Sequence, residues 1–350
     1  CALACKYRKI NEKGEVSGGP FYYLYDGLRN WGQGWGRFGR VLAFLFTVLT
    51  IGASLGGGNM FQANQAFNQV ATQFPALEEY RAVFGFVLAG LVGVVIIGGI
   101  KSIAKVTDKV VPFMSALYVL FSLIIIAMNF DQIGAVFGQI FNGAFNASSL
   151  KGGVVGVLIV GFQRAAFSNE AGIGSAAIAQ SAAKTDKPLT AGFVAMIEPL
   201  VDTVLVCTMT SLVLIFTGYA SGASDLAGSQ LTSAAFSKAI PWFGLVLMVA
   251  IVLFAFSTMI SWSYYGIKGW KFIFGDNKAA DYSYKLLFLV FIVIGASSEL
   301  GAVLAFSDMM ILGMALPNIL GCLLLSSEVR RDLKAYFKKV KTGEIPKTRD

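Results

Sequence analysis

The residues of this chain that can do acid-base or ionic chemistry are few, because most of the sequence is apolar. Only 14% of the 350 residues are charged, and histidine, the commonest general base and metal ligand, does not occur. Ionisable groups nevertheless interrupt the apolar runs, at Arg164, Glu170, Glu198, Asp202, Glu299 and Asp308. Charges in such surroundings are costly and mark ion or substrate pathways. We take Arg164, Glu170 and Asp202 as candidates for a coupling role between bound ligands.

Glu198 and Asp202 are four residues apart, a spacing that puts both carboxylates on one face of a helix. Such a pair can titrate when it is buried. The alternative is that both carboxylates lie near the cytoplasmic end of the helix, where they reach water or a loop lysine.

The stretch from Gly152 to Pro188 is polar at its centre. As one helix, its first 32 residues would be about 48 Å long, which exceeds a hydrocarbon core of about 30 Å. Serine and asparagine bond to freed backbone groups, and glycine accepts unusual dihedral angles. We therefore expect the helix to break between Ser168 and Gly174 and to form one wall of a binding site, as discontinuous helices do in secondary transporters. The candidate substrate contacts in this break are Ser168, Asn169 and Gly172.

Arg164 and Glu170 are six residues apart, which places them about 240° around an unbroken helix axis. Both can face one cavity more readily if the helix opens between them. The alternative is a kinked helix in which this Arg and Glu form a purely structural salt bridge.

A second polar site follows three consecutive glycines in IGASLGGGNMFQANQAFNQV. Five carboxamides follow those glycines, at Asn59, Gln62, Asn64, Gln65 and Asn68. At helical spacing Gln62, Asn59 and Gln65 share a face. We expect at least one of them to face a ligand, although adhesion between helices would explain some of them.

A third site is FSTMISWSYYG, residues 256–266. Ser257, Thr258 and Ser261 supply neutral hydroxyl oxygens, which suit Na⁺, and Trp262 lies one turn after Thr258. The alternative is that these hydroxyls bond back to their own helix.

The elements that position these residues are membrane helices. The chain is 56% hydrophobic with a mean hydropathy of +0.67, which excludes a soluble globular protein. The apolar runs lack the alternation of a barrel and predict an all-α integral membrane protein of about eight spans. The expected spans are 41–70, 84–100, 111–128, 153–182, 192–217, 241–264, 284–297 and 302–325.

Lysine and arginine predict the orientation. With the N-terminus in the cytoplasm, inside segments hold 24 of these residues and outside loops hold three. We therefore expect a multi-pass protein of the cell membrane with a cytoplasmic C-terminus. The basic residues are spread over every inside loop without stacking aromatics, which excludes nucleic acid as a partner. The outside segments 129–150 and 218–240 are long enough for surface helices.

The chain is expected to form one transmembrane domain, residues 1–350, with a cytoplasmic tail at 326–350. We interpret the tail as an interfacial helix followed by disorder. The first residue is Cys1 rather than Met, from which we expect an N-terminal truncation. No HExxH or GxGD motif occurs, so the chain is not expected to be an enzyme.

Five segments resemble those of the alanine/glycine:cation symporters, a family of sodium-coupled amino-acid transporters. They occur in the order of that family and span almost the whole chain: GEVSGGPFYYLYDGL, GGGNMFQAN, FSNEAGIGSAAIAQSAAKTDKP, IEPLVDTVLVCTMTSLVLIFTG and FSTMISWSYYG. The resemblance implies a five-plus-five inverted-repeat fold preceded by one extra helix. It also implies that the eight spans are the last eight of eleven, with the first three missing.

The resemblance further implies roles for individual residues. Gln62 would contact the substrate, Trp262 would help to close its pocket, and Thr258 would ligate sodium. The expected sodium site also includes Ser257 and Ala255, the latter through its main-chain oxygen. Asn59 joins the predicted substrate contacts.

We accordingly expect sodium-coupled symport of a small neutral amino acid, alanine or glycine, by alternating access. No cofactor is expected, Na⁺ is the co-transported ion, and the protein is expected to be a monomer in the lipid bilayer. A proton-coupled amino-acid transporter is the near alternative, because Glu170, Glu198 or Asp202 can titrate if buried. A channel is a further alternative.

Overall fold

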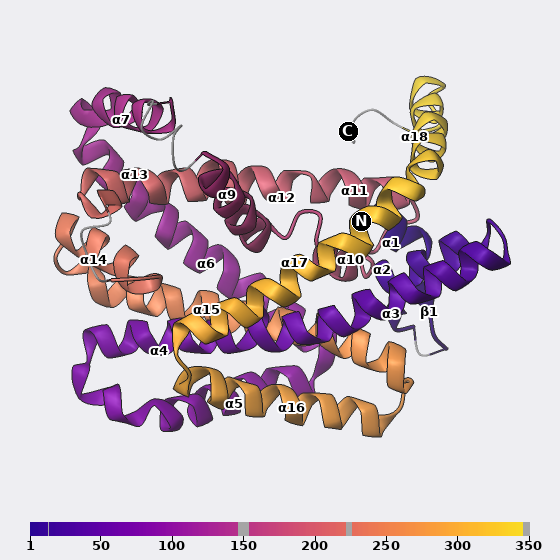
Figure 1. Ribbon diagram of the computed structural model, residues 1–350, viewed down its shortest axis with the longest axis horizontal. Coiled ribbons are helices and arrows are strands. Elements are labelled where there is room, and N and C mark those ends of the chain that lie inside the picture. Colours follow the sequence, from indigo (N-terminus) through magenta and orange to yellow (C-terminus); the bar gives the residue numbers. More distant parts are fainter. Residues whose placement is uncertain (13, 146–153, 222–225, 346–350) are drawn as a thin grey trace.

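The computed structural model describes residues 1–12, 14–145, 154–221 and 226–345, and within these ranges the chain is almost entirely helical (Figure 1). The N-terminal elements are α1 (Ala2–Lys6), β1 (Lys9–Ile10), β2 (Val16–Ser17), α2 (Pro20–Tyr22) and the π-helical turn η1 (Tyr23–Gly27). The two strands form an antiparallel hairpin, with Lys9 opposite Ser17 and Ile10 opposite Val16.

The helices that follow form the body of the molecule. The first group is α3 (Gln33–Leu55), the π-helical turn η2 (Gly56–Met60), α4 (Phe61–Gln73), η3 (Pro75–Tyr80), α5 (Arg81–Ile97), α6 (Gly99–Met128), η4 (Phe130–Gln132) and α7 (Ile133–Phe145). The second group is α9 (Val154–Asn169), α10 (Ser175–Gln180), α11 (Pro188–Ala195), α12 (Ile197–Pro199), the π-helical η5 (Leu200–Cys207), α13 (Thr208–Phe216) and η6 (Tyr219–Ser221). The last group is α14 (Ser229–Ala239), α15 (Phe243–Phe274), α16 (Lys278–Ser297), α17 (Leu300–Leu324) and α18 (Ser326–Lys341).

Seven helical segments of the described chain are long and apolar enough to cross a membrane. They are Gln33–Gln73, Pro75–Ile97, Gly99–Met128, Pro188–Phe216, Phe243–Phe274, Lys278–Ser297 and Leu300–Leu324. Each corresponds to one predicted span. The eighth predicted span, 153–182, is divided into the short helices α9 and α10, so the count of eight is not met by continuous helices. The all-α membrane architecture is confirmed.

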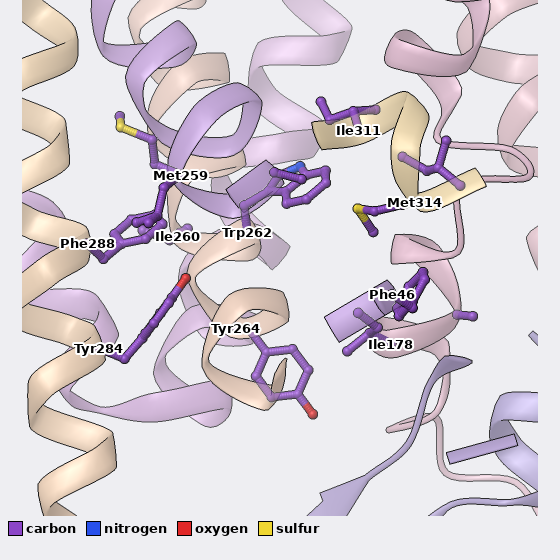
Figure 2. Close-up of a cluster of buried hydrophobic side chains, with 14 of the residues drawn as sticks. Phe46, Ile178, Met259, Ile260, Trp262, Tyr264, Tyr284, Phe288, Ile311 and Met314 are labelled. Carbon is purple, nitrogen blue, oxygen red and sulfur yellow. The ribbon is translucent and has the colours of Figure 1, made fainter. Parts of the chain in front are cut away.

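The main core lies where α3, α10, α15, α16 and α17 meet. Figure 2 shows large side chains from these helices in contact around Trp262, which is only 4% exposed. The cluster includes Phe46, Ile178, Met259, Tyr284, Phe288 and Met314. The hydroxyls of Ser54 and Tyr284 hydrogen-bond at 2.8 Å inside it. Because the core is built from helices of both chain halves, it fixes α15 against α3 and α16.

A second buried cluster joins α6, α13, α14 and α15. The ring of Phe243 stacks on Phe121 with centroids 4.0 Å apart and packs on Phe236 from α14. The segments 129–150 and 218–240 are long enough for helices, and their described parts contain α7 and α14. The expected disordered end of the tail, 346–350, falls outside the described residues. The tail helix itself is α18.

The π-helical turn η2 is packed against its neighbours through glycine. A side chain at Gly295 of α16 would collide with the main chain of Met60, and one at Gly58 would collide with Trp262 of α15. Small residues allow helix backbones to approach closely in a membrane. The position of η2 between α15 and α16 therefore depends on these two glycines.

We expect Gly295→Val to destabilise the protein by about 1–3 kcal/mol, because the new side chain must displace the main chain of η2. The measurement is the melting temperature of the purified protein in neutral detergent. Gly90→Val is the matched control, because Gly90 is exposed on α5 and a side chain there meets no atom within 4 Å. Equal melting temperatures for the two variants would contradict the close packing of α16 on η2.

Candidate functional site

The predicted break in the Gly152–Pro188 stretch is present between α9 and α10. Helix α9 ends at Asn169 and α10 begins at Ser175. Three of the five intervening residues have left-handed backbone, Glu170 with φ 57°, Gly172 with φ 82° and Gly174 with φ 96°. Glycine adopts this conformation at little cost, whereas Glu170 needs compensating contacts. The expectation of an interruption between Ser168 and Gly174 is confirmed.

The Glu170 side chain is held by two neutral donors. Its carboxylate accepts one hydrogen bond from Trp262 Nε1 at 2.9 Å and another from the Ser175 hydroxyl, in the first turn of α10. These contacts tie the break both to α15 and to the helix that follows it. They also account for the unusual backbone at Glu170.

The Gly172 carbonyl, freed by the break, is bound by α17. Asn318 Nδ2 donates to it at 2.7 Å, and Asn318 Oδ1 accepts in turn from the hydroxyl of Tyr23 on η1. Asn318 is 5% exposed and Tyr23 is 1% exposed. Sequence reasoning missed both residues. The one available signal was the pair Pro317–Asn318, a polar residue next to a helix-bending proline in an apolar span.

The glycine-rich turn η2 lies opposite the break, and Trp262 connects the two. The indole of Trp262 covers Gly58 while its Nε1 reaches Glu170. A second contact between the walls is Phe167 of α9 against Phe61 of α4, with ring centroids 5.2 Å apart. Two irregular backbone segments therefore lie on either side of Trp262.

The amides after the three glycines do not share one face. Gln62 is half-buried and donates to its own Gly57 carbonyl at 3.0 Å, whereas Asn59 is fully buried and donates to Phe288 O of α16 at 2.7 Å. Gln65 instead accepts from the main-chain N–H of Ser229, at the start of α14. The expectation of a common face was wrong, because the wide turn η2 contains Asn59 and shifts it around the axis relative to α4.

The three predicted sodium ligands lie on an uninterrupted part of α15. Ser257 donates to Phe254 O at 2.9 Å, and the main-chain oxygen of Ser257 accepts from Ser261 at 2.9 Å, so both are bonded within the helix. Ala255 is likewise inside the regular helix. Thr258 differs, because among the described residues its half-buried hydroxyl has no hydrogen-bond partner. Thr258 is four residues before Trp262 and therefore on the same face of α15.

Arg164 does not pair with Glu170. Its guanidinium forms an ion pair with Asp308 of α17 and lies 5.5 Å from the ring of Phe167. The alternative of a structural Arg164–Glu170 salt bridge is thus not what the structure contains. Asp308 Oδ1 is buried without a hydrogen-bond partner in the described chain, so this pair is only partly satisfied.

Ser168 and Asn169 face the π-helical segment η5 rather than Trp262. Ser168 donates to the carboxylate of Asp202, and Asn169 Nδ2 donates to Thr203 Oγ1 at 2.7 Å. Asn169 Oδ1 also accepts from Ala171 N at 2.9 Å, which closes a tight turn at the start of the break. The structure therefore brings Asp202 to the break, on the side away from η2.

The far end of α10 is tied to the N-terminal segment. Arg8 donates to three carbonyls that follow this helix, those of Ser181, Ala183 and Thr185, at 3.1, 2.7 and 2.9 Å. The thiol of Cys5 contacts Gln180 O at 3.1 Å. These donors satisfy carbonyls at a helix C-terminus that lack partners within the helix. Both ends of α10 are thus held by other parts of the chain.

The assembled site consists mainly of neutral polar groups around one aromatic ring. Within the part of the chain that the structure describes, no three His, Cys, Asp or Glu side chains form a cluster able to hold a metal ion. The oxygen atoms near Trp262 belong to the Glu170 carboxylate, a hydroxyl, amides and main-chain carbonyls, which suit an alkali cation or a small zwitterion better than hydrolytic chemistry.

The known proteins that the sequence resembles are all transporters. The family model described as the sodium:alanine symporter family matches residues 1–350. The chain is 41% identical over 345 residues to the "Sodium/alanine symporter AgcS" of Methanococcus maripaludis, covering 98% of this chain and 74% of that protein. It is 36% identical over 347 residues to the "Uncharacterized transporter YflA" of Bacillus subtilis, covering 96% and 69%. It is 31% identical over 341 residues to the "Probable sodium/glutamine symporter GlnT" of the same organism, covering 97% and 68%.

We expect Asn318→Leu to lower the melting temperature, because the Gly172 carbonyl loses the Asn318 donor and the Tyr23 hydroxyl keeps only its contact with Cys322 Sγ at 3.8 Å; the cost is about 1–3 kcal/mol for an unsatisfied buried group. Tyr23→Phe alone should cost less. The double variant should be less destabilised than the sum of the single variants. Tyr25→Phe is the control, since in the described chain the Tyr25 hydroxyl makes no hydrogen bond. Strict additivity of Asn318→Leu and Tyr23→Phe would show that the two side chains do not act together.

Proposed function

The chain belongs to the sodium:alanine symporter family, and we propose that it carries a small neutral amino acid, alanine or glycine, across its membrane together with Na⁺ by alternating access. Members of this family are transporters and not enzymes, and the apolar helices make this chain a multi-pass membrane protein. Two of the relatives are named as symporters, one for alanine and one, as probable, for glutamine.

The observation that carries this proposal is the convergence of two irregular backbone segments on Trp262. An amino acid is a zwitterion, and its carboxylate and ammonium groups need donors and acceptors that the membrane does not supply. We place the substrate between the break and η2, with Gln62 and the main chain around Gly172 as its polar contacts. Trp262 is 4% exposed and lies against Gly58, so we expect it to restrict the size of the substrate side chain.

The remaining predicted contacts depend on rearrangement. Like Gln62, which donates to Gly57 O, the side chains of Asn59, Ser168 and Asn169 are bonded within the protein, to Phe288, Asp202 and Thr203. They stay predictions for a state in which those bonds are exchanged for substrate. Arg164, Glu170 and Asp202 remain the candidates for coupling. Glu170 lies in the break, Asp202 accepts from Ser168 just before it, and Arg164 lies in α9.

Sodium is proposed to bind beside Thr258. Its hydroxyl is the one of the predicted ligands that is not bonded within α15, and it lies one turn from Trp262. An ion at this position would contact the same face of α15 as the substrate. Coupling would arise because sodium and amino acid together stabilise one arrangement of the helices more than either does alone.

The arrangement proposed for alternating access is the five-plus-five inverted repeat, in which α9 and α10 form the broken first helix of the second repeat. The left-handed residues between α9 and α10 support a hinge there, since they separate two rigid helical pieces. We further propose that the protein acts as a monomer in the cell membrane with α18 on the cytoplasmic side, in accord with the lysine and arginine distribution.

Proton coupling is the second candidate, and one observation favours it. Glu170 borders the break and is bonded to two neutral donors, while the nearby Arg164 pairs with Asp308 instead. A carboxyl that is bonded only to neutral donors inside a membrane is a candidate proton carrier. Among the relatives, a Bacillus subtilis protein is named "Putative sodium/proton-dependent alanine carrier protein YrbD".

Uptake of labelled alanine into cells that express the protein should require Na⁺. We expect uptake to saturate with alanine and to fall to background when choline replaces Na⁺, because the cation site must be filled before the substrate-bound state can form. Undiminished uptake in choline that is abolished by a protonophore would replace the sodium proposal with the proton one. Loss of saturation with a measurable conductance would indicate a channel.

Thr258→Ala should raise the Na⁺ concentration for half-maximal uptake by about tenfold, the effect of losing one oxygen ligand. Thr258→Ser, which keeps the hydroxyl, should restore most of the affinity. Ser257→Ala is the matched control, because that hydroxyl is already bonded to Phe254 O. An unchanged sodium requirement in Thr258→Ala, at equal protein abundance, would remove Thr258 from the site.

A further inference from the structure

Helix α18 leaves the end of α17 at a steep angle and is not aligned with α17 or α3 (Figure 1). At about 100° per residue its side chains separate into three sectors. The apolar sector contains Val329, Leu333, Tyr336, Phe337 and Val340. The acidic sector, on one side of it, contains Glu328 and Asp332 together with Lys339. The basic sector, on the other side, contains Arg330, Arg331, Lys334, Lys338 and Lys341.

The acidic sector is attached to the N-terminal segment. Lys6 lies 2.6 Å from Glu328 and also pairs with Asp332, and the hydroxyl of Tyr7 donates to both oxygens of Glu328 at 3.0 and 2.9 Å. Burial and the Glu328 carboxylate raise the pKa of Tyr7 to about 12, so it keeps the proton that it donates. These contacts fix the rotation of α18 about its axis.

Part of the apolar sector packs on α11. The ring of Phe193 lies 5.8 Å from that of Tyr336 and 6.3 Å from that of Phe337, while Val329 packs against the main core. With the acidic and apolar sectors both engaged, the side of α18 that points away from the protein is the boundary between the apolar and basic sectors.

This boundary is hollowed and has one sign of charge. A hollow of about 500 Å³ is lined by Arg330, Leu333, Lys334, Phe337, Lys338 and Lys341. It contains four cations beside two large apolar side chains and no carboxylate. In the described part of the chain none of the four cations forms an ion pair. Phe337 is 49% exposed in spite of its contact with α11.

We propose that this face of α18, defined by the six residues of the hollow, binds an anionic phospholipid at the membrane surface. The lysines and Arg330 match a phosphodiester, and Leu333 with Phe337 match the first carbons of an acyl chain. The helix begins directly after α17, a spanning helix, so the hollow lies at the depth of lipid headgroups. A soluble anion would contact the cations but not the two apolar side chains. The hollow contains a single aromatic ring, whereas nucleic-acid sites combine cations with several stacking aromatics.

The proposal does not depend on the transported substrate or ion. It concerns a surface on the opposite side of α18 from Lys6 and at a distance from Trp262. Its test can therefore be carried out without transport, and its failure would leave the proposed function as it stands.

The experiment is amide hydrogen exchange of residues 326–341 in the purified protein, held in neutral detergent and titrated with short-chain phosphatidylglycerol. We expect slower exchange in this segment as the lipid binds. Short-chain phosphatidylcholine and glycerol phosphate serve as two further arms, the first with acyl chains and no net charge, the second with the phosphate and no chain. Neither should protect the segment at concentrations where phosphatidylglycerol does.

The variant Lys334→Gln/Lys338→Gln should need about thirtyfold more phosphatidylglycerol for half-maximal protection, as expected for two lost cations at a membrane surface. The matched control is Lys101→Gln/Lys105→Gln, which removes the same charge from exposed lysines at the start of α6 and should titrate like the wild type. Protection by glycerol phosphate alone would replace the lipid with a free anion. Equal protection by phosphatidylcholine, or an unchanged titration in the α18 variant, would overturn the proposal.

Discussion

The structure depends on one constraint, that a main chain which leaves helical hydrogen bonding inside a membrane must find other partners. After Glu170 N, which bonds to Ala166 O, the helical hydrogen-bond pattern stops until α10, and water is not available in hydrocarbon to replace it. Asn318 binds the Gly172 carbonyl, and Glu170 is anchored by Trp262 and Ser175. The irregular segment is tolerated because α15 and α17 surround it, so the site and the core are built from the same contacts.

The second irregular segment, η2, is also enclosed by neighbouring helices, but it is stabilised in a different way. Here glycines take the place of polar side chains, because their lack of a side chain allows α15 and α16 to pack directly on the backbone of η2. Trp262 touches both segments, through its ring on one side and its Nε1 on the other. A movement of α15 relative to one segment therefore also changes the contact of Trp262 with the other segment. This is the kind of shared element that symport requires, since ion and substrate have to influence one another.

The sequence allowed the spans and the break to be predicted, because hydrophobic length and glycine placement are local properties. It did not allow the partners of the break to be predicted. Asn318 is 146 residues from Gly172 along the chain, and nothing near either residue indicates the other. The faces of Asn59 and Gln62 were misjudged for a different reason. Helical spacing was assumed through Gly56–Met60, where the backbone forms a wider turn. Roles at Trp262, Thr258 and Gln62 rested on resemblance, and the structure adds only their surroundings.

The attachment of α10 at both ends has a mechanical consequence. The helix has six residues and is about 9 Å long, too short to be stable by itself, so its geometry is set by its supports. One support is Glu170 with Ser175, the other is Arg8 on the carbonyls after Ser181. Because α10 is held at both ends, it cannot move along its axis without breaking the contacts at one end. A displacement at the Trp262 end therefore acts on the contacts of Arg8 through the six residues of α10 and the turn that follows them.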